Sequence, residues 1–152
     1  MQNLESITEL LEEIERNCDP KTLKKLNLSM TKRVATRLDE YSESCEACGK
    51  MLSELETNLQ GYVDAFQSNE PVNILEHRNV RKGFIDHLAK IHKLLQDDHF
   101  VSTYMALGLS LGLIFGMVLF DNLAMGMMLG LVLGIAIGSG KDADAKKKGK
   151  TI

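Results

Sequence analysis

Two long runs of apolar residues occupy the C-terminal third of the sequence, at residues 101–120 and 123–140. Asp121 is the only charged residue between positions 101 and 140. A helix rises about 1.5 Å per residue, so either run as a helix is close to the thickness of a bilayer's hydrocarbon core, about 30 Å. One helix through both would be about twice too long. Because Asp121 and Asn122 favour turns, the pattern predicts a hairpin of two transmembrane helices.

Glycines recur at every fourth position in both runs. A glycine has no side chain, so a stripe of them lets two helix backbones approach closely. In an antiparallel hairpin that turns at Asp121, the two stripes face each other, although the same stripes could instead face neighbouring protomers. Glycine is also common in membrane helices generally. The stripes are Gly108, Gly112 and Gly116 in the first run, and Gly126, Gly130, Gly134 and Gly138 in the second.

With these stripes, residues 101–140 resemble the glycine-zipper class of membrane hairpins. The resemblance covers this segment alone. It implies that the two helices pack through their glycines, and it implies no particular activity, because proteins of unrelated function share the motif.

The basic residues around the hairpin indicate its orientation. Lysine and arginine precede the first run and follow the second, whereas the turn has none. Loops rich in these residues stay on the cytoplasmic side. We therefore expect both termini in the cytoplasm and the protein in the plasma (inner) membrane, with Asp121 on the far side. Residues 141–152, which hold five lysines, are expected to form a disordered basic tail.

Residues 1–100 have the pattern of an all-α cytoplasmic domain. Apolar residues recur every three or four positions, and from Leu38 to Phe66 the spacing alternates between three and four, as in the seam of a coiled coil. The expected fold is all-α, with a cytoplasmic helical hairpin or coiled coil and a C-terminal two-helix transmembrane hairpin. The pattern predicts cytoplasmic helices over about residues 4–16, 20–68 and 74–100, the last continuing without a break into the first transmembrane helix.

A strongly basic segment opens the second predicted helix. There is no acidic residue between Pro20 and Leu38. Such a helix could lie on anionic lipid, where each cation contributes about 1 kcal/mol. Alternatively, it pairs with the acidic helix at residues 4–16, and the two interpretations are compatible. The residues in question are Lys21, Lys24, Lys25, Lys32, Arg33 and Arg37.

Cys45 and Cys48 are the candidate metal ligands, because two thiolates three residues apart can bind one zinc ion. Histidines could complete the site, but in one continuous helix His87 and His92 would point about 140° apart, which leaves no obvious fourth ligand in the same chain. Two copies of the cysteine pair meeting in a dimer would supply four thiolates. Both cysteines also lie on the apolar stripe, where a thiol can simply fill the core. A redox role is a further possibility.

Composition narrows the function. The chain has 152 residues, a net charge of −3 and 5% aromatic residues, and its polar part leaves little room for a walled active site. We expect neither an enzyme nor a nucleic-acid-binding protein, and no cofactor except possibly zinc. The favoured function is an integral membrane scaffold or adaptor that contacts lipid, self-associates through its helical domain and its glycine-zipper hairpin, and organises a protein partner. The alternatives are a membrane-permeabilising or channel-like oligomer gated by the cytoplasmic helices, and a metal or redox sensor that uses Cys45 and Cys48.

Overall fold

The computed structural model describes residues 2–68 and 70–152. The chain divides into a helical domain that ends at His92 and a hairpin unit, Lys93–Thr151. The helices are α1 (Gln2–Asn17), α2 (Pro20–Leu26), α3 (Leu28–Ser42), α4 (Glu46–Gln67), α5 (Ile74–Ile91), α6 (His99–Leu119) and α7 (Leu123–Lys147). Within the described residues the secondary structure is helical, apart from one isolated bridge between Leu95 and Thr151.

The long helix expected over residues 20–68 is instead three helices. Asn27 adopts a left-handed conformation (φ 50°), which ends α2, and its side chain accepts a hydrogen bond from the backbone N–H of Met30 at the start of α3. The second break follows Ser42, where Cys45 has an extended backbone (φ −136°, ψ 105°). Asparagine tolerates the left-handed region better than most residues. The apolar spacing runs through both breaks, so it could not reveal them.

The helical domain buries one apolar face of each helix. Helices α1, α3 and α4 pack against one another, and α5 packs on α2 and α3. The charged face of α1 stays outside, where Glu9 and Glu12 are exposed. The stripe expected to form a coiled-coil seam is therefore buried within this chain. The fully or nearly buried side chains include Ile7, Ile14, Leu26, Val34, Leu38, Leu52, Leu55, Leu59 and Leu88.

The expected helix over residues 74–100 ends earlier, at Ile91. Lys93 and Asp98 both have positive φ values, 57° and 60°, and these conformations interrupt any continuous rod into α6. At the other end, α7 extends to Lys147, so most of the tail expected to be disordered is helical. Ala145 in this extension is buried, which shows that packing holds the last turns in place.

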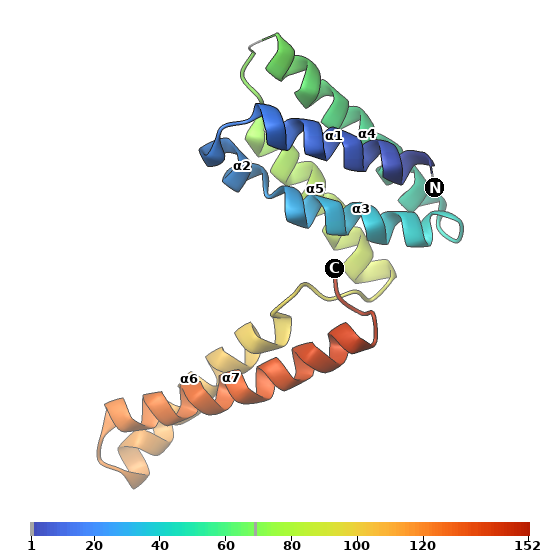
Figure 1. The fold of residues 1–152 in the computed structure, drawn as a ribbon. Coiled ribbons are helices and arrows are strands. Elements are labelled where there is room, and N and C mark those ends of the chain that lie inside the picture. Colours follow the sequence, from blue (N-terminus) through green and yellow to red (C-terminus); the bar gives the residue numbers. More distant parts are fainter. Residues whose placement is uncertain (1, 69) are drawn as a thin grey trace. The chain divides into compact units, whose positions relative to one another are not determined.

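In the hairpin unit, α6 and α7 run side by side (Figure 1). Asp121 has φ 46° and lies in the turn. The Asn122 side chain accepts a hydrogen bond from Met125 N–H and caps α7, while the Asn122 N–H donates to the carbonyl oxygen of Gly116 at 3.0 Å. The Asp121–Asn122 pair therefore forms the turn between the two apolar helices.

Candidate functional sites: the apolar hairpin and a cysteine–histidine cluster

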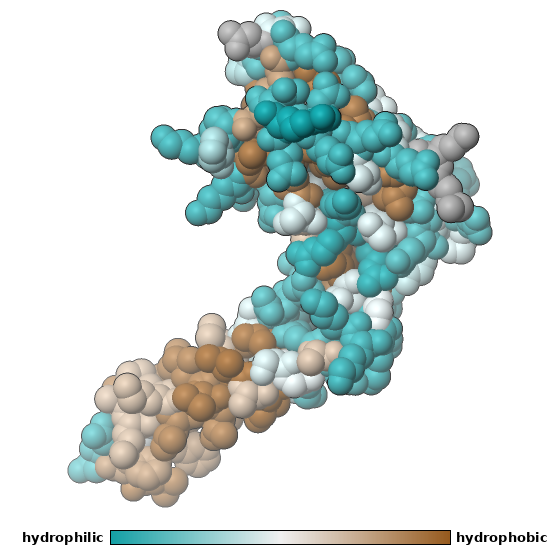
Figure 2. Space-filling view, viewed as in Figure 1, coloured by the Kyte–Doolittle hydropathy of each residue, from teal (hydrophilic) through white to brown (hydrophobic). Residues whose placement is uncertain are grey.

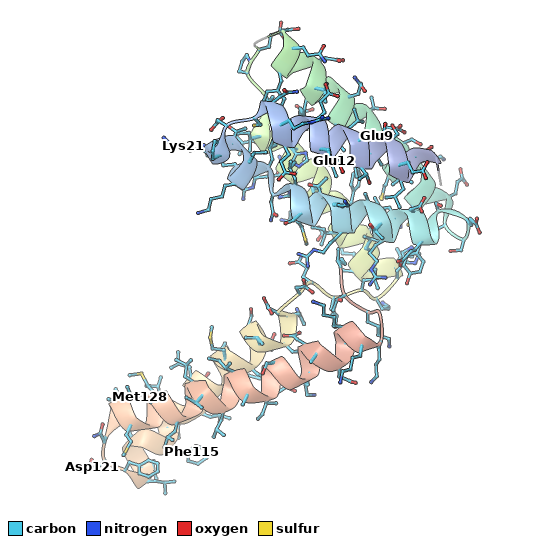
Figure 3. All side chains as sticks on the ribbon, in the orientation of Figure 1. Glu9, Glu12, Lys21, Phe115, Asp121 and Met128 are labelled. Carbon is cyan, nitrogen blue, oxygen red and sulfur yellow. The ribbon has the colours of Figure 1, made fainter. Side chains whose placement is uncertain are left out.

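The hairpin buries its glycines and exposes its large apolar side chains. Gly112, Gly116, Gly126, Gly134 and Gly138 are buried between α6 and α7. Apart from Leu75 and Ile91, the exposed large apolar side chains among the described residues lie between Met105 and Ile137. This outer surface is apolar along most of its length in Figure 2, and Figure 3 shows Phe115 and Met128 pointing away from the helix pair. A surface of this extent is suited to lipid rather than water.

The glycines bring the two backbones into direct contact. A methyl group built on Gly112 would lie 3.0 Å from Cα of Gly130 and closer still to the Gly126 carbonyl oxygen. One on Gly116 would lie 2.9 Å from Cα of Gly126, and one on Gly108 would lie 3.1 Å from Cα of Gly134. The two stripes thus face each other within one chain. Gly138 continues the seam, where a methyl group would approach Phe100 and Val101.

Polar groups gather at the open end of the hairpin. The Asp142 carboxylate accepts hydrogen bonds from the backbone N–H groups of Phe100 (3.0 Å) and Val101 (2.8 Å). A carboxylate on α7 thereby satisfies free N–H donors at the start of α6, where negative charge is also favoured by the helix dipole. The Lys141 ammonium lies 5.2 Å from the centre of the Tyr104 ring. These contacts place charge at one end of the apolar hairpin and Asp121 at the other.

Comparison with known proteins agrees with this geometry. Residues 96–142 match the model of the family described as glycine zipper membrane protein. This segment is a glycine zipper. The match extends to Asp142, so it covers the turn, both glycine stripes and the carboxylate that caps α6. No curated protein and no solved structure matches the chain.

The glycine-zipper match and the two apolar helices together indicate that this chain is a membrane protein. Helices α6 and α7 have 21 and 25 residues and are long and apolar enough to cross a bilayer. Only 11% of the apolar window in α6 and 22% of that in α7 is buried inside the protein. Their outer faces therefore contact lipid.

A cluster of four potential metal ligands lies in the helical domain. The ligand atoms of Cys45, Cys48, His87 and His92 are all within 4.8 Å of one another. Sγ of Cys45 lies 3.5 Å from Nε2 of His87, and Sγ of Cys48 lies 3.2 Å from Nε2 of His92. The cysteines are free thiols. The structure thus gathers in one chain the two cysteines named from the sequence and two histidines.

Helix ends explain why the two histidines converge. The expectation that His87 and His92 point apart assumed one regular helix, and it is wrong because α5 ends at Ile91 and His92 is its C-cap residue. Cys45 is likewise the N-cap residue of α4, rather than a residue within a long helix. The Tyr41 ring stacks on the His92 imidazole with centroids 4.0 Å apart, which helps to fix that ring in the cluster.

The two thiols have opposite shifts in acidity. The backbone N–H of Cys48, at the start of α4, lowers the pKa of the Cys45 thiol because a helix N-terminus stabilises a thiolate. Burial raises the pKa of Cys48 to about 12, with further contributions from its hydrogen bond to Cys45 and from the charge there. Burial, followed by the nearby His87, lowers the pKa of His92 and favours its neutral form. A neutral imidazole is the form that binds metals.

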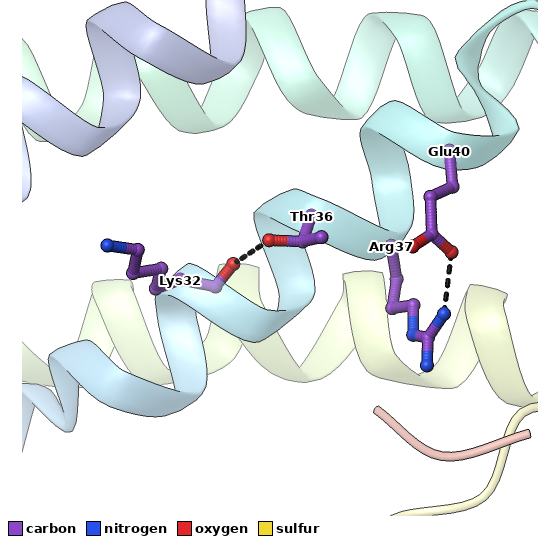
Figure 4. A network of polar contacts seen from close by, with 4 residues as sticks. All are labelled: Lys32, Thr36, Arg37 and Glu40. Carbon is purple, nitrogen blue, oxygen red and sulfur yellow. Dashed lines mark hydrogen bonds and ion pairs between the residues drawn. The ribbon is translucent and has the colours of Figure 1, made fainter. Parts of the chain in front are cut away.

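The basic residues named from the sequence lie on two different helices. Lys21, Lys24 and Lys25 are exposed on α2, and Lys32 and Arg33 are exposed on α3. Arg37 pairs with Glu40, with 2.6 Å between Nη1 and Oε2, as Figure 4 shows. In the same figure the Thr36 hydroxyl donates to the backbone carbonyl of Lys32.

Sequence reasoning missed a cation that joins this surface. Arg78 of α5 lines the same shallow pocket as Lys24 and Lys25, together with Ile74 and Leu75. Because α2 packs on α5, Lys24, Lys25 and Arg78 bring positive charge together across two helices rather than along a single one. Only the packing of the two helices reveals it, since Arg78 is far from the lysines in sequence.

A buried polar cluster links α5 to the break between α2 and α3. His77 is 2% exposed, and its Nε2 lies 3.3 Å from the Thr31 hydroxyl. The Arg81 guanidinium donates to the carbonyl oxygens of Leu26 and Asn27 and to the Thr31 hydroxyl. These bonds satisfy carbonyl groups at the end of α2. Burial, together with the charge of Arg81, lowers the pKa of His77 to about 4.

Proposed function

We propose that this chain is an integral membrane scaffold or adaptor of the plasma membrane, with both termini in the cytoplasm. The glycine zipper anchors the helical domain, and the domain presents a charged surface to a protein partner. The observation that best supports the proposal is the packing of the hairpin. Unlike a soluble protein, it buries its glycines and exposes its large apolar side chains. The basic surface on α2 and α5, Lys24, Lys25 and Arg78, adds affinity for anionic headgroups.

Three hydroxyl groups of the spans, those of Thr103, Ser110 and Ser139, favour a scaffold over a water-filled channel. The Ser110 hydroxyl donates to the carbonyl of Ala106 at 2.6 Å, and the Thr103 hydroxyl donates to that of His99 at 2.9 Å. Ser139 likewise donates to Ala136. Each of these polar groups is satisfied within its own helix, so none requires water beside it.

We further propose that the chain self-associates within the bilayer. Because the glycine seam has no side chains, it leaves an apolar groove along the helix pair, and a second copy of the hairpin fits this groove better than flexible lipid tails. The helical domain contributes little to this association, because its apolar stripe is already buried. The groove is lined by residues that include Leu107, Leu111, Phe115, Leu129, Leu133 and Ile137.

Single-molecule photobleaching in lipid bilayers tests self-association. We expect several copies per spot for the wild type and a shift towards one copy when Leu111 and Leu133 are both changed to alanine. In the matched control, Met117 and Val132, which are exposed but outside the groove, are both changed to alanine. This control should leave the copy number unchanged. Single copies of the wild type at every protein density would refute the proposal.

A separate experiment tests recruitment. Crosslinking in native membranes, followed by capture of the chain, should recover one recurrent protein partner. That recovery should be lost when α6 and α7 are replaced by an unrelated single transmembrane helix, because a scaffold needs the hairpin to organise its partner. Recovery of lipid alone would argue against an adaptor.

A further inference from the structure

We propose that Cys45, Cys48, His87 and His92 bind one Zn²⁺ ion in a closed tetrahedral site. Two thiolates and two imidazoles are a donor set that zinc prefers. In a tetrahedron with Zn–S near 2.3 Å and Zn–N near 2.0 Å, neighbouring ligand atoms are about 3.3–3.8 Å apart. The two Sγ–Nε2 distances, 3.5 and 3.2 Å, already lie close to this range. No two of the four ligand atoms are more than 4.8 Å apart, so binding needs a contraction of about 1.5 Å at most.

The spacing of the ligands along the chain supports this assignment. Two residues separate the cysteines and four separate the histidines, which matches the spacing found in Cys₂His₂ zinc sites. The cysteines lie at the start of α4 and the histidines at the end of α5. The ion would therefore join the start of α4 to the end of α5, two helices that also meet where the Tyr62 and His77 rings lie 5.4 Å apart.

Charge balance also favours zinc. Two thiolates and two neutral imidazoles around Zn²⁺ give no net charge, which suits a site where Cys48 is buried. Binding releases the two thiol protons to solvent, so no oxidant or reductant is needed. Without a metal, the direct contacts between the cysteines and the histidines are thiol–imidazole hydrogen bonds, which are weak.

A site with four protein ligands has no open position for water or substrate, so the ion's role is structural. It fixes the end of the helical domain from which the chain continues to the glycine zipper. His92 is the last residue of that domain, and α6 begins at His99. The inference goes beyond the proposed function because it needs neither a partner nor self-association.

Metal analysis of the full chain, purified in detergent without chelator, is the first test. We expect about one zinc per chain for the wild type and a loss of at least tenfold in Cys45→Ser, His87→Gln and His92→Gln. Cys18→Ser and His99→Gln are the matched controls and should keep the ion, since neither residue belongs to the cluster. Metal-free wild type that takes up no added zinc would overturn the proposal.

The histidine variants separate this site from a four-thiolate site shared by two copies. If Cys45 and Cys48 of two chains bound one ion, the stoichiometry would be half, and the histidine variants would keep it. Either result would contradict a Cys₂His₂ site.

A second measurement on the unaltered protein covers the case in which a variant fails to fold. With zinc bound, an alkylating reagent should modify Cys18 alone. Adding a chelator should make Cys45 and Cys48 at least tenfold more reactive, while Cys18 is unchanged. Substitution by Co²⁺ should give the intense visible absorption of a tetrahedral site and a thiolate-to-metal charge-transfer band. Thiol reactivity that is indifferent to the chelator would exclude a metal role for both cysteines.

Discussion

Valine in place of Gly126 is expected to force the two helices of the glycine zipper apart. Gly126 faces the backbone of two glycines in α6: an added carbon would lie 2.6 Å from the backbone nitrogen of Gly116 and would also overlap Cα of Gly116 and the carbonyl of Gly112. Backbone atoms cannot rotate away as side chains can. Overpacking of this kind costs about 1–3 kcal/mol or more, and the helices can relieve it only by separating.

The separation can be measured as a distance in lipid nanodiscs. Spin labels carried by unnatural residues at Met105 and Ile137, both exposed on the hairpin, should show a longer and broader distance distribution in Gly126→Val. The control is Gly140→Val on the same helix, because nothing lies within 4 Å of a carbon added at Gly140. Equal distance distributions for the two variants would show that the glycine seam does not hold the hairpin closed.

Acid is expected to unfold the helical domain through His77. Its pKa is about 4 in the folded state, against an ordinary value of 6.5, so the unfolded chain binds this proton more readily. The contribution of neutral His77 to the free energy of unfolding is therefore fully present above about pH 6.5, and it is lost as the pH drops from 6.5 towards 4. The total loss in the free energy of unfolding is roughly 3 kcal/mol. The cause is burial beside the Arg81 guanidinium, 3.4 Å from the His77 ring.

Urea unfolding of the full chain in detergent, with chelator present throughout, measures this loss without any contribution from metal. His77→Gln should be less stable at pH 7.5 but should lose much less stability between pH 7.5 and 4.5 than the wild type. His99→Gln, at an exposed position in the hairpin unit, should keep the wild-type dependence. If wild type and His77→Gln lose stability equally, another group is responsible for the acid sensitivity.

The hairpin was predictable because, in a bilayer, glycine positions indicate which face of a helix packs against its partner. Large apolar side chains occur on both faces of a membrane helix, whereas a stripe of glycines marks the face where two helix backbones approach closely. Regular placement of Gly112, Gly116, Gly126 and Gly130 was enough to indicate an antiparallel pair with facing stripes. The capping of α6 by Asp142 was not predictable, because it depends on a contact between residues 41 or 42 positions apart.

The cysteine–histidine cluster shows where periodicity fails. Helical-wheel reasoning treats each segment as one regular helix, but the residues of this cluster lie at helix ends, where the angles no longer apply. Cys45 precedes α4 in an extended conformation, and His92 follows α5. The apolar stripe continues across the breaks at Asn27 and at residues 43–45, so its three- and four-residue steps do not mark them. The spacing of the two cysteines and the two histidines is visible in the sequence. It is a better guide than helical-wheel angles to which residues come together in this cluster.

The central claim is that the C-terminal third crosses the bilayer twice through a glycine zipper, and site-directed labelling of intact cells tests it most directly. A membrane-impermeant maleimide should label Asp121→Cys from outside, whereas Lys148→Cys and the wild type, with its three native cysteines, should be labelled only after permeabilisation. The protein should also stay with the membrane during alkaline extraction. Labelling of position 121 only after permeabilisation, or release of the protein into the aqueous fraction, would contradict the account.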